Sequence, residues 1–388
     1  MAIPLSYSYR NLLTRKFTTV LTAGGMSLVS FVFAAVLMLA EGLEQTLVDT
    51  GSVENVIVLR GAAETEVSSS VERNEASIIV SQPEVAMNAI GDPVASKESL
   101  VLVTLPRKVS QAPINVIVRG VGKHSHELRP QVKIIEGRAP RPGSHEVMAG
   151  KNIADRVENT QIGDKIRFAL IDWDVVGIFD AGKTAFSSEL WADGDQLMAA
   201  FRRNSYSSVI MKVLGSESFS ALKKRLVSDP RLSVQVKREI DIYRDQSELM
   251  SKFIRILGLA MTIFFSLGAI LGAMVTMYTA VANRTREIGA MRALGFTRAS
   301  ILVAFLAESI TLGLIGGLVG LLGSSGLQFL TISTMNWETF SELAFGFALT
   351  PAIVADTMLF ALGMGLAGGL LPAWRASRLK IVDALRET

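Results

Sequence analysis

The chain of 388 residues contains no cysteine and only three histidines, His124, His126 and His145. Without cysteine it can form no disulfide, no zinc site built on thiolates and no thiol nucleophile. His124 and His126 could bind a metal from one strand face, but no second pair lies near them, so we interpret them as part of a polar turn. Residue order and spacing suggest no Ser/His/Asp arrangement either. We therefore expect no active site in this chain.

One pattern associated with nucleotide binding does occur. Residues 177–184, GIFDAGKT, match GxxxxGK[ST] and follow a strand-like run. The segment lacks further glycines where backbone amides would approach phosphates, and no convincing acidic strand partner follows it. We interpret it as a β-turn with a solvated Lys183, and we expect no cofactor to bind to this chain.

Apolar residues make up 49% of the sequence, and the mean hydropathy is +0.37. This is more than a soluble domain needs to build its core. The net charge of +3 is unevenly distributed, because residues 41–250 carry 26 basic and 29 acidic residues while the remainder carries 13 and 7. The basic excess thus belongs to the apolar part, so we expect contact with membrane lipids and no binding to nucleic acid.

Four apolar stretches are long enough to cross a bilayer. Residues 17–40 are uncharged and would form about 36 Å of helix, against a hydrocarbon core of about 30 Å. A cleaved signal peptide is the alternative, but its apolar region is usually only about 7 to 15 residues long. The other predicted spans are 256–283, 301–330 and 351–374, the last of them within an apolar run that begins near Leu343.

Basic clusters at 10–16, 284–298 and 375–386 fall on one side of the membrane if there are four spans. Lysine and arginine are enriched on the cytoplasmic side, so both termini are predicted to be cytoplasmic. The predicted cytoplasmic parts are an N-terminal helix at 1–16, a helix at 284–300 and a tail at 375–388; residues 41–255 and a loop at 331–350 lie outside. The chain is expected in the inner or plasma membrane.

Between the first two spans the sequence pattern becomes that of a mixed α/β domain. Short β-branched runs bounded by Gly, Pro, Asp and Ser predict strands, and three amphipathic stretches predict helices. The predicted strands are 54–60, 76–82, 99–105, 114–121, 165–171, 172–179 and 207–214, and the predicted helices are 151–157, 194–203 and 216–227. The Pro/Gly-rich segment 136–146 is the expected internal boundary. Residues 41–48 and 239–257 are expected to prolong the neighbouring spans as stalks.

The predicted fold class is therefore an α-helical membrane protein with four transmembrane helices plus a mixed α/β extracytoplasmic domain inserted between helices 1 and 2. Glu308 and Asp356 are ionisable residues within the apolar runs. We expect Glu308 to pair with an arginine of the adjacent loop and Asp356 to lie at an interface. GxxxG pairs at 268/272, 313/317, 316/320 and 365/369 allow close helix packing, either within one subunit or across a dimer seam.

Residues 283–300, NRTREIGAMRALGFTRAS, form a basic segment between two apolar runs. Ile288, Met291 and Leu294 recur at helical spacing, Gly295 provides a stop, and Thr297 could cap the helix that follows. Anchoring by positive charge on the cytoplasmic side is one interpretation. A docking surface for a cytoplasmic partner is the other.

The same segment resembles the cytoplasmic loop of the FtsX-like permease family of ABC transporters, in which R-x-x-E-I-G-x-x-R-A-x-G-x-x-x-x-x-I recurs. The loop matches at Arg284, Glu287, Ile288, Gly289, Arg292, Ala293, Gly295 and Ile301, and a similar terminal pattern matches at Pro372, Ala373, Arg375, Ala376, Ser377, Ala384, Leu385 and Arg386. Ile381 stands where a proline is usual. The start of the chain is similar to the family's first span, and residues 136–184 are similar to its extracytoplasmic core domain.

The resemblance implies a permease subunit of the macrolide-exporter or lipoprotein-release type that is not itself an enzyme. Two copies of a separate ABC ATPase, which carry the ATP and Mg, would dock on Arg284, Arg286, Glu287, Ile288, Met291, Arg292, Leu294, Gly295, Arg375 and Arg378. Their closure would move the external domain through the stalks, a mechanism called mechanotransmission, and so drive export or extraction of a substrate at the outer face.

The resemblance also implies further partners. These are a second permease chain, in a homodimer or a heterodimer, and a periplasmic adaptor protein. The alternative function is that of a membrane-anchored regulator or signalling protein, which would control an extracytoplasmic partner such as a cell-wall hydrolase.

Overall fold

The computed structural model describes residues 16–379, which form two compact units. The membrane unit runs up to Glu41 and also contains Lys252–Leu330 and the chain from Phe347 onward. The α/β unit contains Gly42–Ser251 and Thr331–Gly346. Apart from Lys16, the predicted N-terminal helix lies outside the described residues, as do Ile381, Ala384, Leu385 and Arg386 of the terminal pattern.

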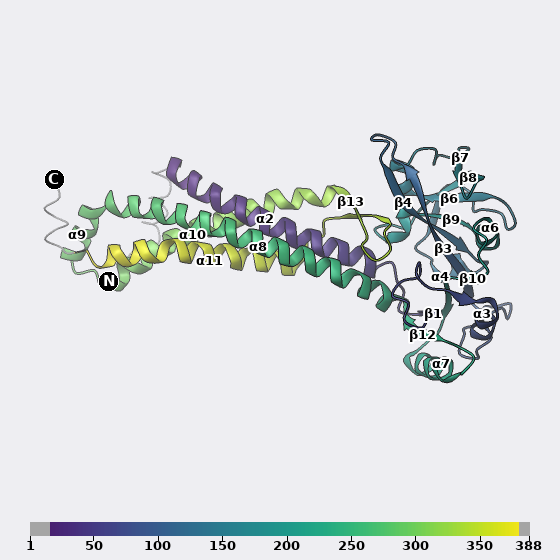
Figure 1. Cartoon of the computed structure of the whole chain (residues 1–388). Coiled ribbons are helices and arrows are strands. Elements are labelled where there is room, and N and C mark those ends of the chain that lie inside the picture. The colour runs from purple at the N-terminus through teal and green to yellow at the C-terminus, as the bar shows by residue number, and fades with distance from the viewer. Residues whose placement is uncertain (1–15, 380–388) are drawn as a thin grey trace. The chain divides into compact units, whose positions relative to one another are not determined.

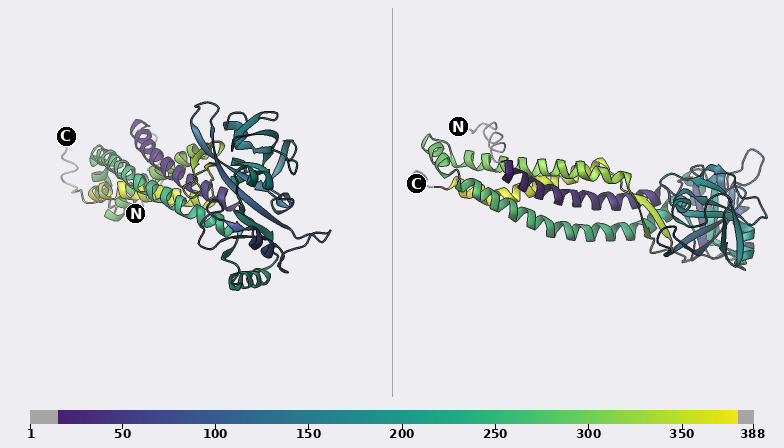
Figure 2. Two further views of the ribbon diagram at one scale, coloured as in Figure 1. Left: turned by 45° about the vertical axis from the view of Figure 1, so that its right-hand side comes forward. Right: turned by 90° about the horizontal axis from the view of Figure 1, so that it is seen from above.

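Four apolar helices dominate the membrane unit, α2 (Lys16–Val48), α8 (Glu239–Ala282), α10 (Arg298–Ser325) and α11 (Pro351–Ser377). All are long and apolar enough to cross a membrane, which confirms the predicted number of spans. Their membrane segments run alongside one another in Figures 1 and 2. A threonine side chain caps the start of α10 at Thr297 and of α11 at Thr350. Asp356 is exposed in the second turn of α11.

Glycines let α10 approach its neighbours closely. A Cβ atom placed on Gly313 would lie 2.5 Å from the carbonyl oxygen of Ala361, and one on Gly365 would lie 2.8 Å from that of Ser309. The Ser309 hydroxyl donates a hydrogen bond of 2.6 Å to the Gly365 carbonyl. These glycines therefore pack within one chain. Around Gly268 and Gly272, by contrast, no described atom lies within 4 Å of an added Cβ.

A ten-stranded sheet forms the centre of the α/β unit, in the order β12-β1-β11-β3-β4-β9-β6-β8-β5, with β7 beside β8. Most neighbours are antiparallel, but β4/β9 and β6/β8 are parallel. The strands are β1 (Asn55–Arg60), β3 (Ala95–Pro106), β4 (Pro113–Val121), β5 (Lys133–Gly137), β6 (Glu146–Gly150), β7 (Lys165–Phe168), β8 (Ile171–Asp180), β9 (Glu189–Asp193), β11 (Ser208–Lys212) and β12 (Val234–Arg238).

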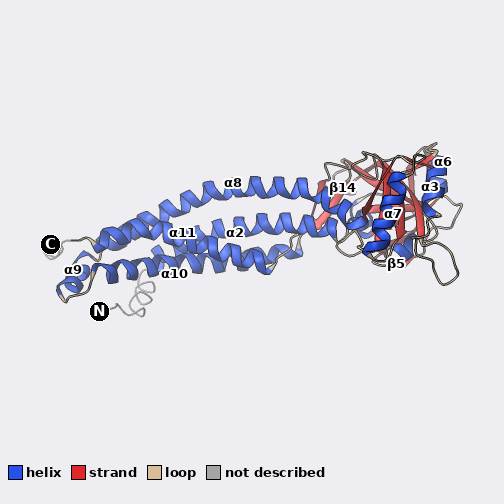
Figure 3. Ribbon diagram, turned by 90° about the horizontal axis from the view of Figure 1, so that it is seen from below, coloured by secondary structure: helices blue, strands red, loops and turns tan. Residues whose placement is uncertain are grey.

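Short helices and two small ribbons complete this unit, and Figure 3 shows α3, α6 and α7 around the strands. The helices are α3 (Arg73–Val80), α4 (Ser125–Leu128), α5 (Lys151–Arg156), α6 (Gly194–Ala200), α7 (Ser216–Ser228) and the 3-10 turn η1 (Ala185–Ser188). The ribbons pair β2 (Val71–Glu72) with β10 (Ser205–Tyr206) and β13 (Thr331–Met335) with β14 (Glu342–Gly346). The 3-10 turn η2 (Gly326–Phe329) follows α10.

A small hydrophobic cluster on the sheet contains Ile57 and Ile210. Two larger clusters lie along the sheet, one around Trp173 and Val116 and the other around Val209 and Leu222. The strand β3 joins them, because its residues from Ala95 to Glu98 pair with β11 and the rest pair with β4. The expected boundary at 136–146 is therefore wrong: β5 and β6, at the two ends of that segment, both pair with β8.

The predicted strand at 76–82 is also wrong, because residues 73–80 form the helix α3. Glu72 and Glu75 make a reciprocal capping box that starts the helix, and Ala76 and Ile79 then face the core at helical spacing. The cap outweighs the strand preference of the β-branched run Ile78–Val80. The apolar run near Leu343 likewise begins in a strand, β14, and α11 starts only at Pro351.

The helix packing in the membrane unit can be tested with two glycines of α11. Gly365→Ala should lower the free energy of unfolding by about 1–3 kcal/mol, because the new methyl group would meet the backbone of α10. Gly363→Ala is the matched control, since no described atom lies within 4 Å of a Cβ there. Thermal unfolding of the detergent-solubilised chain measures both; equal midpoints would contradict the packing described here.

Candidate functional site

The basic segment after α8 forms the helix α9 (Thr285–Ala293), as its periodicity predicts. Gly295 has a φ of +95°, a conformation that suits glycine and ends the helix. The Thr297 hydroxyl then accepts a hydrogen bond of 3.2 Å from the Ser300 amide and begins α10. In Figure 1, α9 lies at one end of the membrane unit, near the last described residues of α11.

Arg284, at the N-cap of α9, is buried and makes an ion pair within the membrane unit. Its Nη1 lies 2.9 Å from Oε2 of Glu308 on α10, and the exposed fractions of the two residues are only 4% and 6%. The guanidinium also lies 5.8 Å from the ring centre of Phe305. The expected pairing of Glu308 with an arginine of the adjacent loop is thus confirmed.

Ile288 fixes the other buried face of α9. It is fully buried in a cluster that contains Met277 of α8, Ile301 of α10 and Ala376 of α11. The short helix is therefore attached to three membrane helices at once. Because a nine-residue helix has little stability of its own, this burial and the Arg284 ion pair are what position it.

The predicted docking residues are divided between the interior and the surface. Arg284 and Ile288 are buried, so these two side chains hold the segment in place and offer no surface to a partner. Met291 and Arg292 are half-buried. The exposed members are Arg286, Glu287, Leu294 and Gly295 on or just after α9, and Arg375 and Arg378 at the end of α11.

The pattern at 177–184 lacks the geometry of a phosphate-binding loop. Gly177 to Asp180 belong to β8 and pair with its neighbours, and a 3-10 turn, not a helix, follows Thr184. A Cβ on Gly177 would lie 2.3 Å from the Arg138 carbonyl oxygen, so this glycine serves the packing of the sheet. A phosphate-binding loop needs free backbone amides at the start of a helix.

The three histidines also have local neighbours. His124 lies 3.1 Å from a carboxylate oxygen of Glu127, while His126 and His145 pack near Trp191 and Trp173. Burial lowers the pKa of His126. No group of three or more potential metal-binding side chains occurs among residues 16–379.

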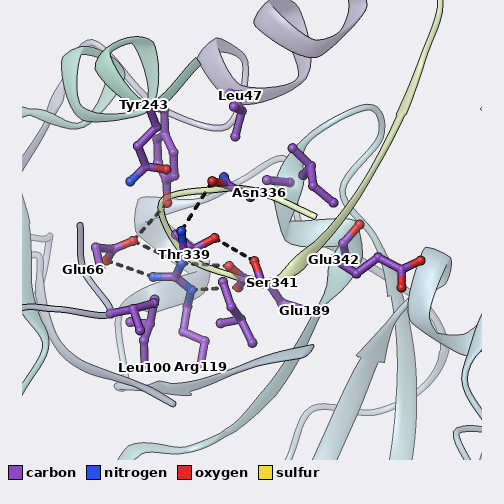
Figure 4. Close-up of a pocket in the computed structure, with 16 residues that line it drawn as sticks. Leu47, Glu66, Leu100, Arg119, Glu189, Tyr243, Asn336, Thr339, Ser341 and Glu342 are labelled. Atoms are coloured by element: carbon purple, nitrogen blue, oxygen red, sulfur yellow. Dashed lines mark hydrogen bonds and ion pairs between the residues drawn. The ribbon is translucent and has the colours of Figure 1, made fainter. Parts of the chain in front are cut away.

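A network of buried charges occupies the middle of the α/β unit, and the sequence pattern did not reveal it. Arg119 on β4 contacts three carboxylates, at 2.8 Å from Glu189, 2.9 Å from Glu98 and 3.0 Å from Glu66. Figure 4 shows the Arg119 guanidinium between Glu66 and Glu189. Tyr243 of α8 donates a hydrogen bond of 3.2 Å to Glu66.

A second arginine joins the network to the first residue of α8. Arg129 lies 2.5 Å from Glu98 and 3.4 Å from Glu239, and all three residues are fully buried. Glu239 also accepts hydrogen bonds from the Asn55 side chain at 2.8 Å and the Ser52 amide at 3.0 Å. The start of α8 is thereby held to the sheet by ionic contacts that water does not reach.

Burial and charge act on Glu98 in opposite directions. Burial opposes its ionisation, but Arg129 and Arg119 outweigh that effect and lower the pKa of Glu98 to about 2. Burial likewise disfavours the charged form of Arg119, yet Glu189 and Glu66 raise its pKa above the usual value. Glu98 and Arg119 are therefore both charged at neutral pH, and losing one partner would leave a charge buried without compensation.

The Arg284–Glu308 pair can be tested by single and double substitutions. Glu308→Gln and Arg284→Gln should each lower the free energy of unfolding by about 3–5 kcal/mol, because each leaves one partner of a buried pair uncompensated. Arg284→Met combined with Glu308→Leu should recover most of this loss. The exposed Arg286→Gln is the control. A double variant as unstable as the single ones would contradict charge compensation as the role of the pair.

The pKa of Glu98 predicts a dependence on pH. Its stabilising effect is complete above its ordinary pKa of 4.5 and is lost as the pH falls through about 2. At neutral pH, Glu98→Gln should cost about 3 kcal/mol, which corresponds to this shift in pKa. The difference in free energy of unfolding between the unsubstituted chain and the variant should decrease as the pH falls from 4.5 to 2, with unfolding followed by tryptophan fluorescence. A difference that stays constant over this range would exclude Glu98 as the titrating group.

Comparisons with known proteins bear on both units. The family model of the MacB-like periplasmic core domain matches residues 19–228, more than half of the chain, and that of the FtsX-like permease C-terminal region matches residues 259–381. The periplasmic region of MacB from Actinobacillus actinomycetemcomitans aligns with 53% of this chain and 95% of its own, at 13% identity and a TM-score of 0.37.

Two curated relatives show the extent of the sequence similarity. The macrolide export ATP-binding/permease protein MacB of Burkholderia pseudomallei is 26% identical over 295 residues, which cover 70% of this chain and 43% of that protein. The uncharacterized ABC transporter permease YknZ of Bacillus subtilis is 30% identical over 222 residues, which cover 55% and 54%. The chain thus spans about half the length of these relatives. It belongs to the MacB-like, FtsX-type family of ABC transporter permeases, as a multi-pass membrane protein with a mixed α/β domain inserted between its first two membrane helices.

Proposed function

We propose that this chain is the permease subunit of an ABC transporter in which a separate ATPase drives movements of the α/β domain. These movements would export or extract a substrate at the outer face of the membrane. In this arrangement α9 and both termini are cytoplasmic, the α/β domain is extracytoplasmic, and ATP and Mg are bound by two ATPase copies.

The construction of α9 is the observation that carries this proposal. One side of the helix presents Arg286, Glu287 and Leu294, the last with 73% of its surface exposed. The other side is held by Arg284 and Ile288 to the helices α8, α10 and α11. A partner that moves α9 would therefore move the ends of three membrane helices, whereas simple anchoring by positive charge needs no such attachment.

Helix α8 supports transmission of that movement to the α/β domain. It is a single helix from Glu239 to Ala282, with one end beside α9 in the chain and the other in the buried ion network. A displacement at its cytoplasmic end would thus be delivered directly to the sheet. Transport by such movement requires no polar path between the helices.

A second permease chain is the other partner we propose. An apolar groove between α2 and α8, with a volume of about 600 Å³, is lined by Gly25, Gly268, Gly272 and Phe264 among others. Its glycines lie close to no described atom that an added Cβ would meet, so a helix of a second chain could pack there closely. Macrolide export is the activity named for MacB. For this chain we propose only that the substrate is reached at the outer face of the membrane.

Docking of the ATPase can be tested by changing only the exposed side of α9. Arg286→Glu combined with Leu294→Glu should reduce co-purification of the ATPase from native membranes about tenfold or more, because it reverses a charge and removes an apolar contact. The buried Arg284 stays in place, so the segment keeps its fold. Lys224→Glu on the exposed face of α7 is the matched control.

Two results would contradict the proposal. One is that no ATPase follows the unsubstituted tagged chain. The other is that the ATPase is retained equally by the α9 double variant and by the Lys224→Glu control, which would assign the basic segment to membrane anchoring alone.

A further inference from the structure

The connector between α10 and α11 contains the hairpin β13–β14, which belongs to the α/β unit and not to the membrane unit. One residue, Leu330, separates η2 from β13, and four residues separate β14 from α11. Four extended residues span at most about 14 Å. The Ala348 amide in this short link also donates a hydrogen bond of 3.0 Å to the Met38 carbonyl of α2. The hairpin is therefore joined to α10 and α11 by short links.

Glu342 attaches the hairpin to the rest of the α/β unit. Its carboxylate lies 2.8 Å from Arg107, which follows β3, and 3.7 Å from Arg156 at the end of α5. The Glu342 side chain is only 8% exposed. Because the carboxylate is almost buried between two arginines, it resists separation from them more than a surface ion pair would.

Hydrogen bonds to the backbone fix the hairpin along its length. Asn115 of β4 donates to the Phe340 carbonyl at 3.1 Å, and the Ala344 amide donates to the Ser188 hydroxyl at 3.2 Å. Arg156 also donates to the Thr331 carbonyl at 3.4 Å. These contacts come from three different elements of the domain, so the hairpin has one defined position on it.

The tip of the hairpin closes a small cavity over the buried ion network. The cavity has a volume of about 30 Å³, and its lining includes Arg119, Glu66 and Glu189 from the network and Asn336 and Ser341 from the hairpin. Figure 4 shows the hairpin residues facing Arg119. Asn336 and Ser341 are each only 5% exposed. The hairpin thus covers the part of the network around Arg119, in which Glu66 accepts the hydrogen bond from Tyr243 of α8.

We propose that this hairpin is a latch, held by Glu342 between Arg107 and Arg156, through which α10 and α11 move the α/β domain by a route separate from α2 and α8. The inference rests on the proposed function, because a second route has a use only if the membrane helices move. Such a latch stays closed while the membrane helices move. With the latch closed, α10 and α11 are connected to the α/β domain as α2 and α8 are, so the four helices would have to move together.

The absence of cysteine from the chain allows a direct test by labelling. Ser341→Cys introduces a single buried thiol under the hairpin, and the rate of its reaction with a maleimide in the full-length chain reports opening. Adding Glu342→Gln should raise this rate about tenfold or more, because the amide loses the charged hydrogen bond to Arg107. Arg107→Gln should raise it less, since Arg156 still faces Glu342.

Glu146→Gln is the matched control. Glu146 pairs with Arg138 at 2.6 Å in the same domain, but outside the hairpin contacts, so its loss should leave the labelling rate within about twofold. Glu342→Gln labelling no faster than the control would overturn the latch.

A second labelling experiment uses the permease assembled with its ATPase. Addition of ATP and Mg to the unsubstituted Glu342 background should leave the Ser341→Cys rate within about twofold, because the latch holds during the cycle. A rise to the Glu342→Gln rate would overturn the latch and indicate a releasing gate. The comparison without ATP requires no ATPase, so failure of the proposed function, seen as absence of an ATPase partner, is distinguishable from failure of the latch.

Discussion

A charge can be buried only beside its counter-charge, and this chain meets that requirement at both ends of α8. At the start of the helix, Glu239 lies against Arg129 within the network that also contains Glu98 and Arg119. Just beyond its other end, Arg284 lies against Glu308 of α10. Each pair has a defined geometry because water cannot replace a missing partner. A buried ion pair therefore holds the start of α8, and another holds the segment just after its end, to neighbouring elements.

The buried ion pairs suggest how a permease of this family could transmit movement. The exposed side of α9 includes Arg286 and Glu287, and its buried side is attached to membrane helices through Ile288 and Arg284. In the α/β unit, the ion pair between Glu239 and Arg129 attaches the start of α8 to the rest of the unit. The ion pair between Glu342 and Arg107 attaches the hairpin. Under the proposed function, these attachments would carry a movement of α9 to the α/β domain.

The sequence predicted what depends on local composition and missed what depends on distant partners. Apolar runs predicted four membrane helices, and helical spacing with Gly295 predicted α9. The network was missed because its members are far apart in sequence, although an arginine such as Arg119 inside a β-branched run was a usable signal. The hairpin was missed for the same reason, since Arg107 precedes Glu342 by 235 residues. Local rules also conflicted at α3, where a capping box overrode β-branched residues.

The most direct test of coupling is a distance between the two units in the working complex. Spin labels at Leu170→Cys in the α/β unit and Leu359→Cys on α11 use positions that are 89% and 65% exposed, in a chain without other cysteines. Pulsed electron paramagnetic resonance would compare the ADP-bound complex with one trapped in the ATP state. If the membrane helices drive the α/β domain, the distance distribution shifts between the two states. Distributions that superimpose while the complex hydrolyses ATP would contradict it.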